Sequence, residues 1–180
     1  MSSIDLGCGP NKRADIGIDF YPYPGVDIVW DLSRFPWPIK TASFHRAEAH
    51  QVLEHLPVHR DVAGTDLLFR FCEEVWRILR PGGVFELDVP HVQGPFAFGD
   101  PTHRRHFTER SFNWLLTGDR DDLYPRRRWD MESLQIDRAY WMSWHVNHYL
   151  PRVHAVLTKV GFGAPSQISV RLRKKVDGNP

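Results

Sequence analysis

The length and composition of the chain fit one globular domain. No linker-like stretch divides its 180 residues, so we treat 1–180 as a single domain. Lys and Arg number 23 against 22 Asp and Glu, and this balance argues against a broad nucleic-acid or anionic-membrane surface. With two cysteines and no apolar run of about 18 residues, we expect a cytoplasmic protein without a membrane span.

The first half of the chain predicts an α/β sheet. Five short apolar segments have the length of buried strands: 4–6, 16–19, 27–31, 44–50 and 84–89. Before the last of them, apolar side chains at helical spacing predict a helix over 62–79, which the Pro and Gly residues at 81–83 would end. Only 11–15 separate the first two strands, and this segment is too short for the helix of a usual parallel crossover.

The second half of the chain is less regular. Residues 91–110 are rich in Pro, Gly and His, and we interpret 91–130 as a lid or pocket wall with a short helix over 109–116. Two further strands are expected at 134–144 and 167–172, separated by a helix over 150–160. These two strands would close the sheet at one edge.

Glycines and acids gather where the first three predicted strands end. Gly7 and Gly9 follow the first strand, while Asp19 and Asp31 close the second and the third. Because ligands of open α/β sheets bind outside the carboxyl ends of the strands, these residues are expected to meet. Glycines let the backbone approach a ligand, and a carboxylate can accept hydrogen bonds from both hydroxyls of a ribose. The pattern therefore predicts a site for a ligand that contains a nucleoside.

A dinucleotide is the first alternative for this site. The dehydrogenase fingerprint needs a third glycine three residues after the second, at the start of a helix that carries the pyrophosphate. Lys12 occupies that position, and no helix is predicted there, so the pattern argues against NAD.

Three motifs, in the right order, carry a resemblance to a known family. Residues 4–9, Ile-Asp-Leu-Gly-Cys-Gly, resemble motif I of the class I S-adenosylmethionine-dependent methyltransferases. Residues 52–55, Val-Leu-Glu-His, and residues 74–83, which end in Pro-Gly-Gly, resemble later motifs of the type 11 branch. The resemblance implies a Rossmann-like class I methyltransferase fold, with a mostly parallel seven-stranded sheet and an antiparallel last strand, here with the first helix reduced or absent. It also implies S-adenosylmethionine as the methyl donor.

The resemblance further assigns residues to the donor. The motif I turn would line the methionine and ribose, the acids after the second and third strands would hold the ribose and the adenine, and the end of the fourth strand would face the methionine. Because the first helix is reduced, Lys12 or Arg13 would bind the donor's carboxylate. The predicted donor site comprises Asp5, Gly7, Cys8, Gly9, Lys12, Asp19, Asp31, Leu32, His50 and Gln51.

Histidine is the other conspicuous residue, with ten in the chain. His103 with His106, and His145 with His148, are spaced three apart, which on a helix would suit a metal ion. No Cys pair or Glu-x-x-His motif supports such a site, so no metal is predicted. An acid–base role is the alternative, and it is needed only if the methyl acceptor must lose a proton. The candidates are His55, His91, His103 and His106.

The sequence thus favours transfer of a methyl group from S-adenosylmethionine to a small-molecule acceptor that it does not identify, with 91–130 as the acceptor-binding segment. One competing hypothesis is a non-catalytic binding or regulatory protein that keeps the fold, because the first helix is reduced. Another is an RNA or protein methyltransferase. For RNA, the basic runs at 126–128 and 171–175 would have to form one face beside the donor site. The oligomeric state does not follow from the sequence.

Overall fold

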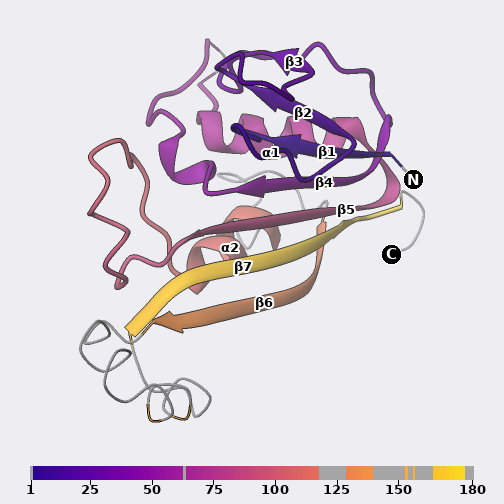
Figure 1. The fold of residues 1–180 in the computed structure, drawn as a ribbon. Coiled ribbons are helices and arrows are strands. Elements are labelled where there is room, and N and C mark those ends of the chain that lie inside the picture. The colour runs from indigo at the N-terminus through magenta and orange to yellow at the C-terminus, as the bar shows by residue number, and fades with distance from the viewer. Residues whose placement is uncertain are drawn as a thin grey trace.

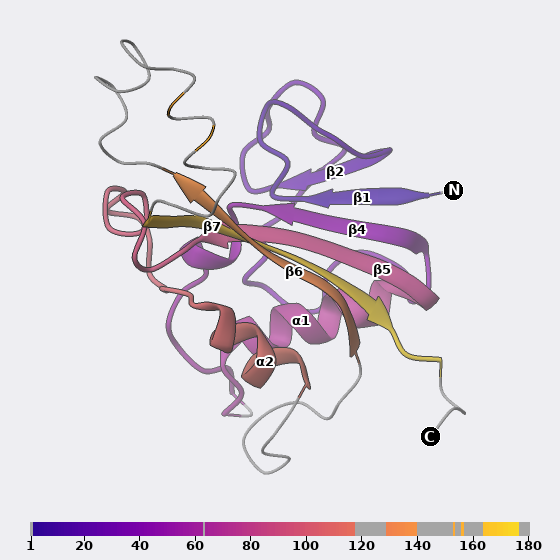
Figure 2. The same cartoon turned by 90° about the horizontal axis from the view of Figure 1, so that it is seen from below.

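A seven-stranded mixed sheet forms the centre of the molecule, and the helices α1 and α2 lie on the same face of it (Figures 1 and 2). The computed structural model describes residues 2–62, 64–117, 129–139, 153, 156 and 164–176. The strands are β1 (Ser3–Leu6), β2 (Ile16–Asp19), β3 (Ile28–Val29), β4 (Phe44–His50), β5 (Leu79–Pro90), β6 (Trp129–Ala139) and β7 (Ala164–Lys174). The helices are α1 (Leu67–Ile78), α2 (Glu109–Thr117) and the single 3-10 turn η1 (Leu53–His55).

The order of the strands confirms the predicted fold class. The strands lie side by side as β3-β2-β1-β4-β5-β7-β6. The first five are parallel, whereas β7 runs antiparallel to β5 and to β6. This is a Rossmann-like, mostly parallel sheet with an antiparallel last strand. Because the parallel strands point the same way, the carboxyl ends of β1, β2, β3 and β4 meet at one edge of the sheet.

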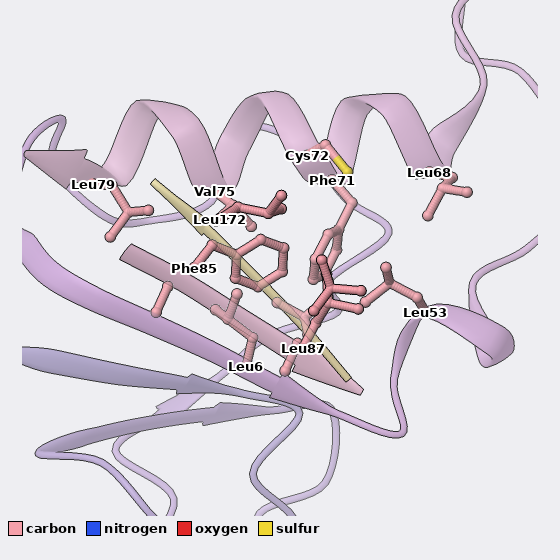
Figure 3. Packing of buried hydrophobic residues seen from close by; sticks show 14 of the residues in the cluster. Leu6, Leu53, Leu68, Phe71, Cys72, Val75, Leu79, Phe85, Leu87 and Leu172 are labelled. Atoms are coloured by element: carbon pink, nitrogen blue, oxygen red, sulfur yellow. The ribbon is translucent and has the colours of Figure 1, made fainter. Parts of the chain in front are cut away.

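Helix α1 covers one face of the sheet and supplies much of the core. Its N-terminus is capped by Asp66, whose carboxylate accepts the backbone N–H of Leu68 at 2.8 Å. Figure 3 shows Phe71 of α1 facing Phe85 of β5, and their ring centroids are 6.4 Å apart. Both rings are fully buried, and burial of a side chain of this size stabilises a fold by roughly 1.5–3 kcal/mol. The buried residues of α1 recur at helical spacing: Leu67, Leu68, Phe71, Cys72, Val75 and Ile78.

The connection between β1 and β2 contains no helix, as the sequence predicts. Asp15, just before β2, folds back onto the start of β1, where its carboxylate accepts both the N–H and the hydroxyl of Ser3 at 2.9 Å. Residues 7–15 therefore form a short loop that returns directly to the neighbouring strand. The glycine turn consequently lies at the edge of the sheet where the parallel strands end.

In the first half of the chain, three element boundaries differ from the predictions. Helix α1 begins at Leu67 rather than at 62, because the backbone of Asp61 hydrogen-bonds with Gly64 and Thr65 just before the capping residue, Asp66. Strand β5 begins at Leu79 rather than at 84, since Leu79 pairs with Phe44 and a register shift absorbs the Pro-Gly-Gly segment. The third strand keeps only Ile28–Val29 of the predicted 27–31, because it lies at the edge of the sheet with one paired neighbour.

In the second half, α2 confirms the short helix predicted over 109–116. Strand β6 begins at Trp129 rather than 134, because its first residues pair with the end of β7, which itself extends beyond the predicted 167–172. Residues 118–128 and 140–144, and the predicted helix over 150–160 apart from positions 153 and 156, lie outside the described residues. None of the helices described is long and apolar enough to span a bilayer.

Candidate functional site

The edge where the parallel strands end contains a pocket of about 460 Å³, which we call the strand-end pocket. Its volume falls within the range of roughly 300–1,000 Å³ that is typical of small-molecule sites. Among the predicted donor residues, five line it: Gly7, Asp19, Asp31, Leu32 and Gln51. The rest of its wall consists of Phe20, Tyr21, Ser33, Val52, His55, Leu56 and Pro57. The fold thus brings together residues from the ends of four different strands.

The glycine turn after β1 forms one side of the pocket. Gly7 has a φ of +75°, and a Cβ atom there would come within 2.6 Å of Cγ2 of Val52, so only glycine fits. Gly9 donates its N–H to one carboxylate oxygen of Asp19 at 2.8 Å, while Tyr21 donates its N–H to the other at 2.9 Å. Each oxygen keeps a second lone pair, so Asp19 is held in place and can still accept hydrogen bonds from two hydroxyls.

Asp31 lies in the loop after β3. Its Oδ1 accepts the N–H of Ser33 at 2.9 Å and the hydroxyl of the same residue at 2.6 Å, which fixes the loop against the pocket. Phe20 and Tyr21 are 58% and 57% exposed and contact each other edge to face at 5.0 Å. Two exposed aromatic rings beside an oriented carboxylate suit a flat heteroaromatic ligand with polar edges.

Asp88 on β5 organises the end of β4. One of its carboxylate oxygens hydrogen-bonds to Nδ1 of His50, and the other accepts a hydrogen bond from Nε2 of Gln51 at 2.7 Å. Gln51 has a φ of +55°, which is unusual for a residue other than glycine, and its N–H donates to the carbonyl of Asp88 at 3.0 Å. Asp88 therefore holds both predicted residues: Gln51, which lines the pocket, and His50, which does not.

This pairing also sets the charges of the three residues. The hydrogen bond to Asp88 raises the pKa of His50 above its ordinary value. Burial would raise the pKa of Asp88, but the hydrogen bonds from His50 and Gln51 outweigh burial and hold the pKa below its usual value. The sequence prediction missed Asp88, which shares its strand with a second acid, Glu86, so no local signal singled it out.

The remaining predicted donor residues do not line the pocket. Asp5 is buried, and its carboxylate accepts a hydrogen bond from the backbone N–H of Arg13 at 2.9 Å, so it holds the loop of residues 7–15 in place. Cys8 is also buried, and burial, reinforced by Asp5, raises the pKa of its thiol to about 11. The ammonium group of Lys12 pairs with Asp27 at 2.8 Å and so anchors the loop to the segment before β3.

Arg13 is the other cation of this loop. It is close enough to His50 and Asp88 for its charge to act on both groups. No hydrogen bond or ion pair of its guanidinium occurs with the residues that the structure describes, and Arg13 is exposed. Of the two cations that the sequence offered for the donor's carboxylate, Lys12 is thus paired with Asp27, whereas the guanidinium of Arg13 has no ion pair among the described residues.

Glu54, His55 and His103 form a second group of polar side chains next to the strand-end pocket. The rings of His55 and His103 contact each other edge to face, with centroids 4.8 Å apart and an interplanar angle of 73°. Glu54 is 1% exposed, and burial raises the pKa of its carboxyl to about 7. Burial and the adjacent His103 lower the pKa of His55, so its neutral imidazole is favoured.

A second pocket lies on the other side of His55. Its lining consists of His55, Pro57, Val58, Thr102 and Arg104, and its volume is about 620 Å³. His55 and Pro57 are common to both pockets. A molecule in one pocket and a molecule in the other would therefore approach each other at His55.

The other two candidate catalytic histidines lie elsewhere. His91 is buried, its Nδ1 accepts the N–H of Gln93 at 3.1 Å, and its Nε2 is 3.4 Å from Glu109 of α2. The ring of His106 packs against Phe98 with centroids 4.2 Å apart. Neither histidine lines the two pockets, so only His55 and His103 of the four come together.

Similar folds occur among solved structures. An S-adenosylmethionine-dependent methyltransferase from Mesorhizobium loti is one of them. The match covers 96% of this chain and 90% of the Mesorhizobium chain, with a TM-score of 0.55 and 17% sequence identity. The matched chain in the complex of the Haloferax volcanii Trm112 methyltransferase activator aligns with 97% of this chain over 83% of its own length, with a TM-score of 0.60 and 14% identity. The match to the [4+2]-cyclase SpnF covers 97% of this chain and 74% of the cyclase chain, with a TM-score of 0.57 and 14% sequence identity.

The protein has the fold of these methyltransferases. At such identities the likeness establishes the architecture, and the presence of a cyclase among the matches shows that this fold supports more than one chemistry. No family model matches the sequence, and no curated protein does. The type 11 motifs of residues 52–55 and 74–83 therefore remain a resemblance, and the function must be argued from the site.

Proposed function

We propose that this protein binds S-adenosylmethionine in the strand-end pocket and transfers its methyl group to a small molecule. The observation that carries the proposal is the arrangement of Asp19 and Asp31, two oriented carboxylates, around a glycine turn at the carboxyl end of a Rossmann-like sheet. The volume of the pocket and its exposed aromatic rings suit a nucleoside.

In the proposed complex, the ribose hydroxyls donate to the free lone pairs of Asp19, whose other lone pairs are already occupied by backbone N–H groups. The adenine lies on the side of Asp31 and Leu32. The methionine end lies toward Gln51, where Arg13 supplies the positive charge for the carboxylate that a first helix would otherwise bind. The acidic groups around the pocket favour the positively charged sulfonium.

The proposed acceptor site is the second pocket, next to His55 and Thr102. Methyl transfer is a displacement, so the main task of the protein is to align the acceptor atom with the methyl group. The acceptor would enter from the side of Val58 and Arg104 and would reach the donor at the shared wall. His55 and His103 are the candidates for contact with it, whereas the positions of His91 and His106 suit structural roles.

A second function remains open to test, because the loop of residues 7–15 lacks the first helix and one matched structure is a cyclase. In this alternative the chain binds the donor molecule without transferring its methyl group. The match to a chain that assembles with the Trm112 activator also suggests turnover assays with and without a protein partner.

Calorimetric titration with S-adenosylmethionine and S-adenosylhomocysteine tests the donor site. We expect micromolar binding that weakens about 30-fold, or by about 2 kcal/mol, in Asp19→Ala, because charge-assisted hydrogen bonds to the ribose are lost. Asp130→Ala is the matched control, since Asp130 lies on β6, is 62% exposed and does not line the pocket. No binding to the wild-type protein would refute the proposal. Binding without S-adenosylhomocysteine formation across an acceptor panel would favour the non-catalytic alternative.

A further inference from the structure

We propose that Glu54, His55 and His103 bind a divalent transition-metal cation such as Zn²⁺. One ligand atom of each side chain, a carboxylate oxygen or an imidazole nitrogen, lies within 4.8 Å of those of the other two. No local sequence motif predicts this site, because His103 lies 48 residues after His55 and only the fold brings the two side chains together. The inference concerns a property of this chain that is separate from donor binding.

The buried carboxylate is the first argument. Glu54 is 1% exposed, and neither of its oxygens has a hydrogen-bond partner among the residues that the structure describes. A buried carboxylate without a donor or a cation is costly, and buried charges in proteins are paired or coordinate metals. A cation held between Glu54 and the two histidines would satisfy this group.

The hydrogen bonds of the two histidines are the second argument. Nδ1 of His103 lies 3.1 Å from the carbonyl oxygen of Ala97, which can only accept, so Nδ1 carries the hydrogen and Nε2 keeps a lone pair. The hydroxyl of Thr102 donates to Asp100 at 2.6 Å and therefore accepts from Nδ1 of His55 at 3.0 Å. Both neutral rings thus keep a lone pair on Nε2, in the arrangement that metal-binding histidines commonly adopt. Nε2 of His103 lies 4.0 Å from a carboxylate oxygen of Asp100, which is beyond hydrogen-bond distance.

The donor set indicates the class of cation. Two imidazoles and one carboxylate are the ligands of several catalytic zinc sites, whereas Mg²⁺ and Ca²⁺ prefer oxygen ligands. Ligand atoms around a tetrahedral zinc lie about 3.4 Å apart, given bonds of about 2.1 Å, so ligand atoms that now lie within 4.8 Å of one another would close by up to about 1.4 Å on binding. Three protein ligands leave a coordination position for an exogenous molecule.

The position of the site suggests what this open position would bind. His55 belongs to the wall between the strand-end pocket and the second pocket, and Thr102 lines the second pocket. This step rests on the proposed methyl transfer: a hydroxyl-bearing acceptor would reach the cation from the second pocket. A bound cation supplies positive charge that lowers the pKa of an acceptor hydroxyl, so the histidines would position the acceptor through the metal rather than act as bases.

A calorimetric titration of the untagged protein with Zn²⁺ tests the site. No S-adenosyl compound is present in this experiment. We expect one Zn²⁺ per chain and at least 100-fold weaker binding in His103→Ala and in Glu54→Gln, with Mg²⁺ failing to compete. His106→Ala is the matched control, because His106 packs on Phe98 outside the cluster and should leave the affinity within twofold of the wild type. Co²⁺ gives an independent readout, since its visible absorption reports coordination by the protein.

Either of two results would overturn the proposal: no Zn²⁺ binding by the wild-type protein, or equal loss in His103→Ala and His106→Ala. The far-ultraviolet circular dichroism of each variant checks that it folds, and His103→Ala keeps the test valid if Glu54→Gln does not fold. The Zn²⁺ titration contains no methyl donor, so its result does not depend on whether the protein binds S-adenosylmethionine. Zn²⁺ binding without donor binding would support only the metal site.

Discussion

Replacing Asp88 by Asn is expected to destabilise the protein in a pH-dependent manner. The carboxylate accepts hydrogen bonds from His50 and Gln51, and its side chain is 14% exposed while that of His50 is 24% exposed. An amide has one oxygen, so either His50 or Gln51 would face its NH₂ group and lose a partner. The loss of one charge-assisted hydrogen bond corresponds to about 2 kcal/mol near pH 5.5.

The direction of the two pKa shifts sets the pH window. The hydrogen bond to Asp88 raises the pKa of His50 in the folded protein above 6.5, its value in the unfolded chain. The stabilisation from His50 is therefore fully present below pH 6.5 and is lost as the pH rises through the pKa of the folded protein. The pKa of Asp88 is lowered, so its contribution is present above 3.8 and is lost as the pH falls through the folded value. Together they stabilise the fold most between these two unfolded values.

Urea denaturation of wild type and Asp88→Asn at pH 5.5 and at pH 8 measures this difference. The expected loss shrinks from about 2 kcal/mol to about 1 kcal/mol at the higher pH, where a neutral His50 still donates to the carboxylate. Asp130→Asn on β6 is the control, since the side chain of Asp130 is 62% exposed and pairs with Lys175 at the surface, so its loss should cost less than about 1 kcal/mol at both pH values. An equal loss for Asp88→Asn at the two pH values would refute the reasoning.

Three further predictions concern the glycine turn, the loop cation and the thiols. Gly7→Ala should cost about 1–3 kcal/mol more than Gly9→Ala in urea denaturation, because both glycines have positive φ but only the first Cβ would meet a side chain; equal losses would contradict this. Arg13→Ala should weaken S-adenosylhomocysteine about tenfold in calorimetry and leave methylthioadenosine, which lacks the carboxylate, unchanged; equal weakening of both would argue against the assigned role. Cys8 and Cys72 are buried, and burial raises the pKa of their thiols to about 11 and about 12, so both should react with iodoacetamide at pH 8 only in denaturant. Rapid labelling of either in the native protein would contradict this.

Much of the fold could be predicted from the sequence, because most of its parallel strands are short and buried and are bounded by turns that contain glycine or proline. The period of apolar residues in α1 and the glycine turn after β1 are local signals, and local signals placed most elements in the right order. The boundaries of β5 and β6 were harder, since Leu79 and Trp129 join the sheet only through pairing with strands that are remote in the sequence.

The site divides in the same way. Asp19 and Asp31 were predictable, because an acid at a strand end points to the common edge of a parallel sheet. The role of Asp88 was not, because it depends on the register that sets this residue opposite His50 on the neighbouring strand. The contact between His55 and His103 depends on the path of an irregular loop, which no periodicity records.

The most direct test of the donor site is a crystal structure of the protein grown with S-adenosylhomocysteine. We expect the ribose hydroxyls within hydrogen-bond distance of Asp19, the adenine beside Asp31 and Leu32, and the sulfur atom directed toward His55. S-adenosylhomocysteine bound elsewhere, or bound here with its ribose away from Asp19, would contradict the account.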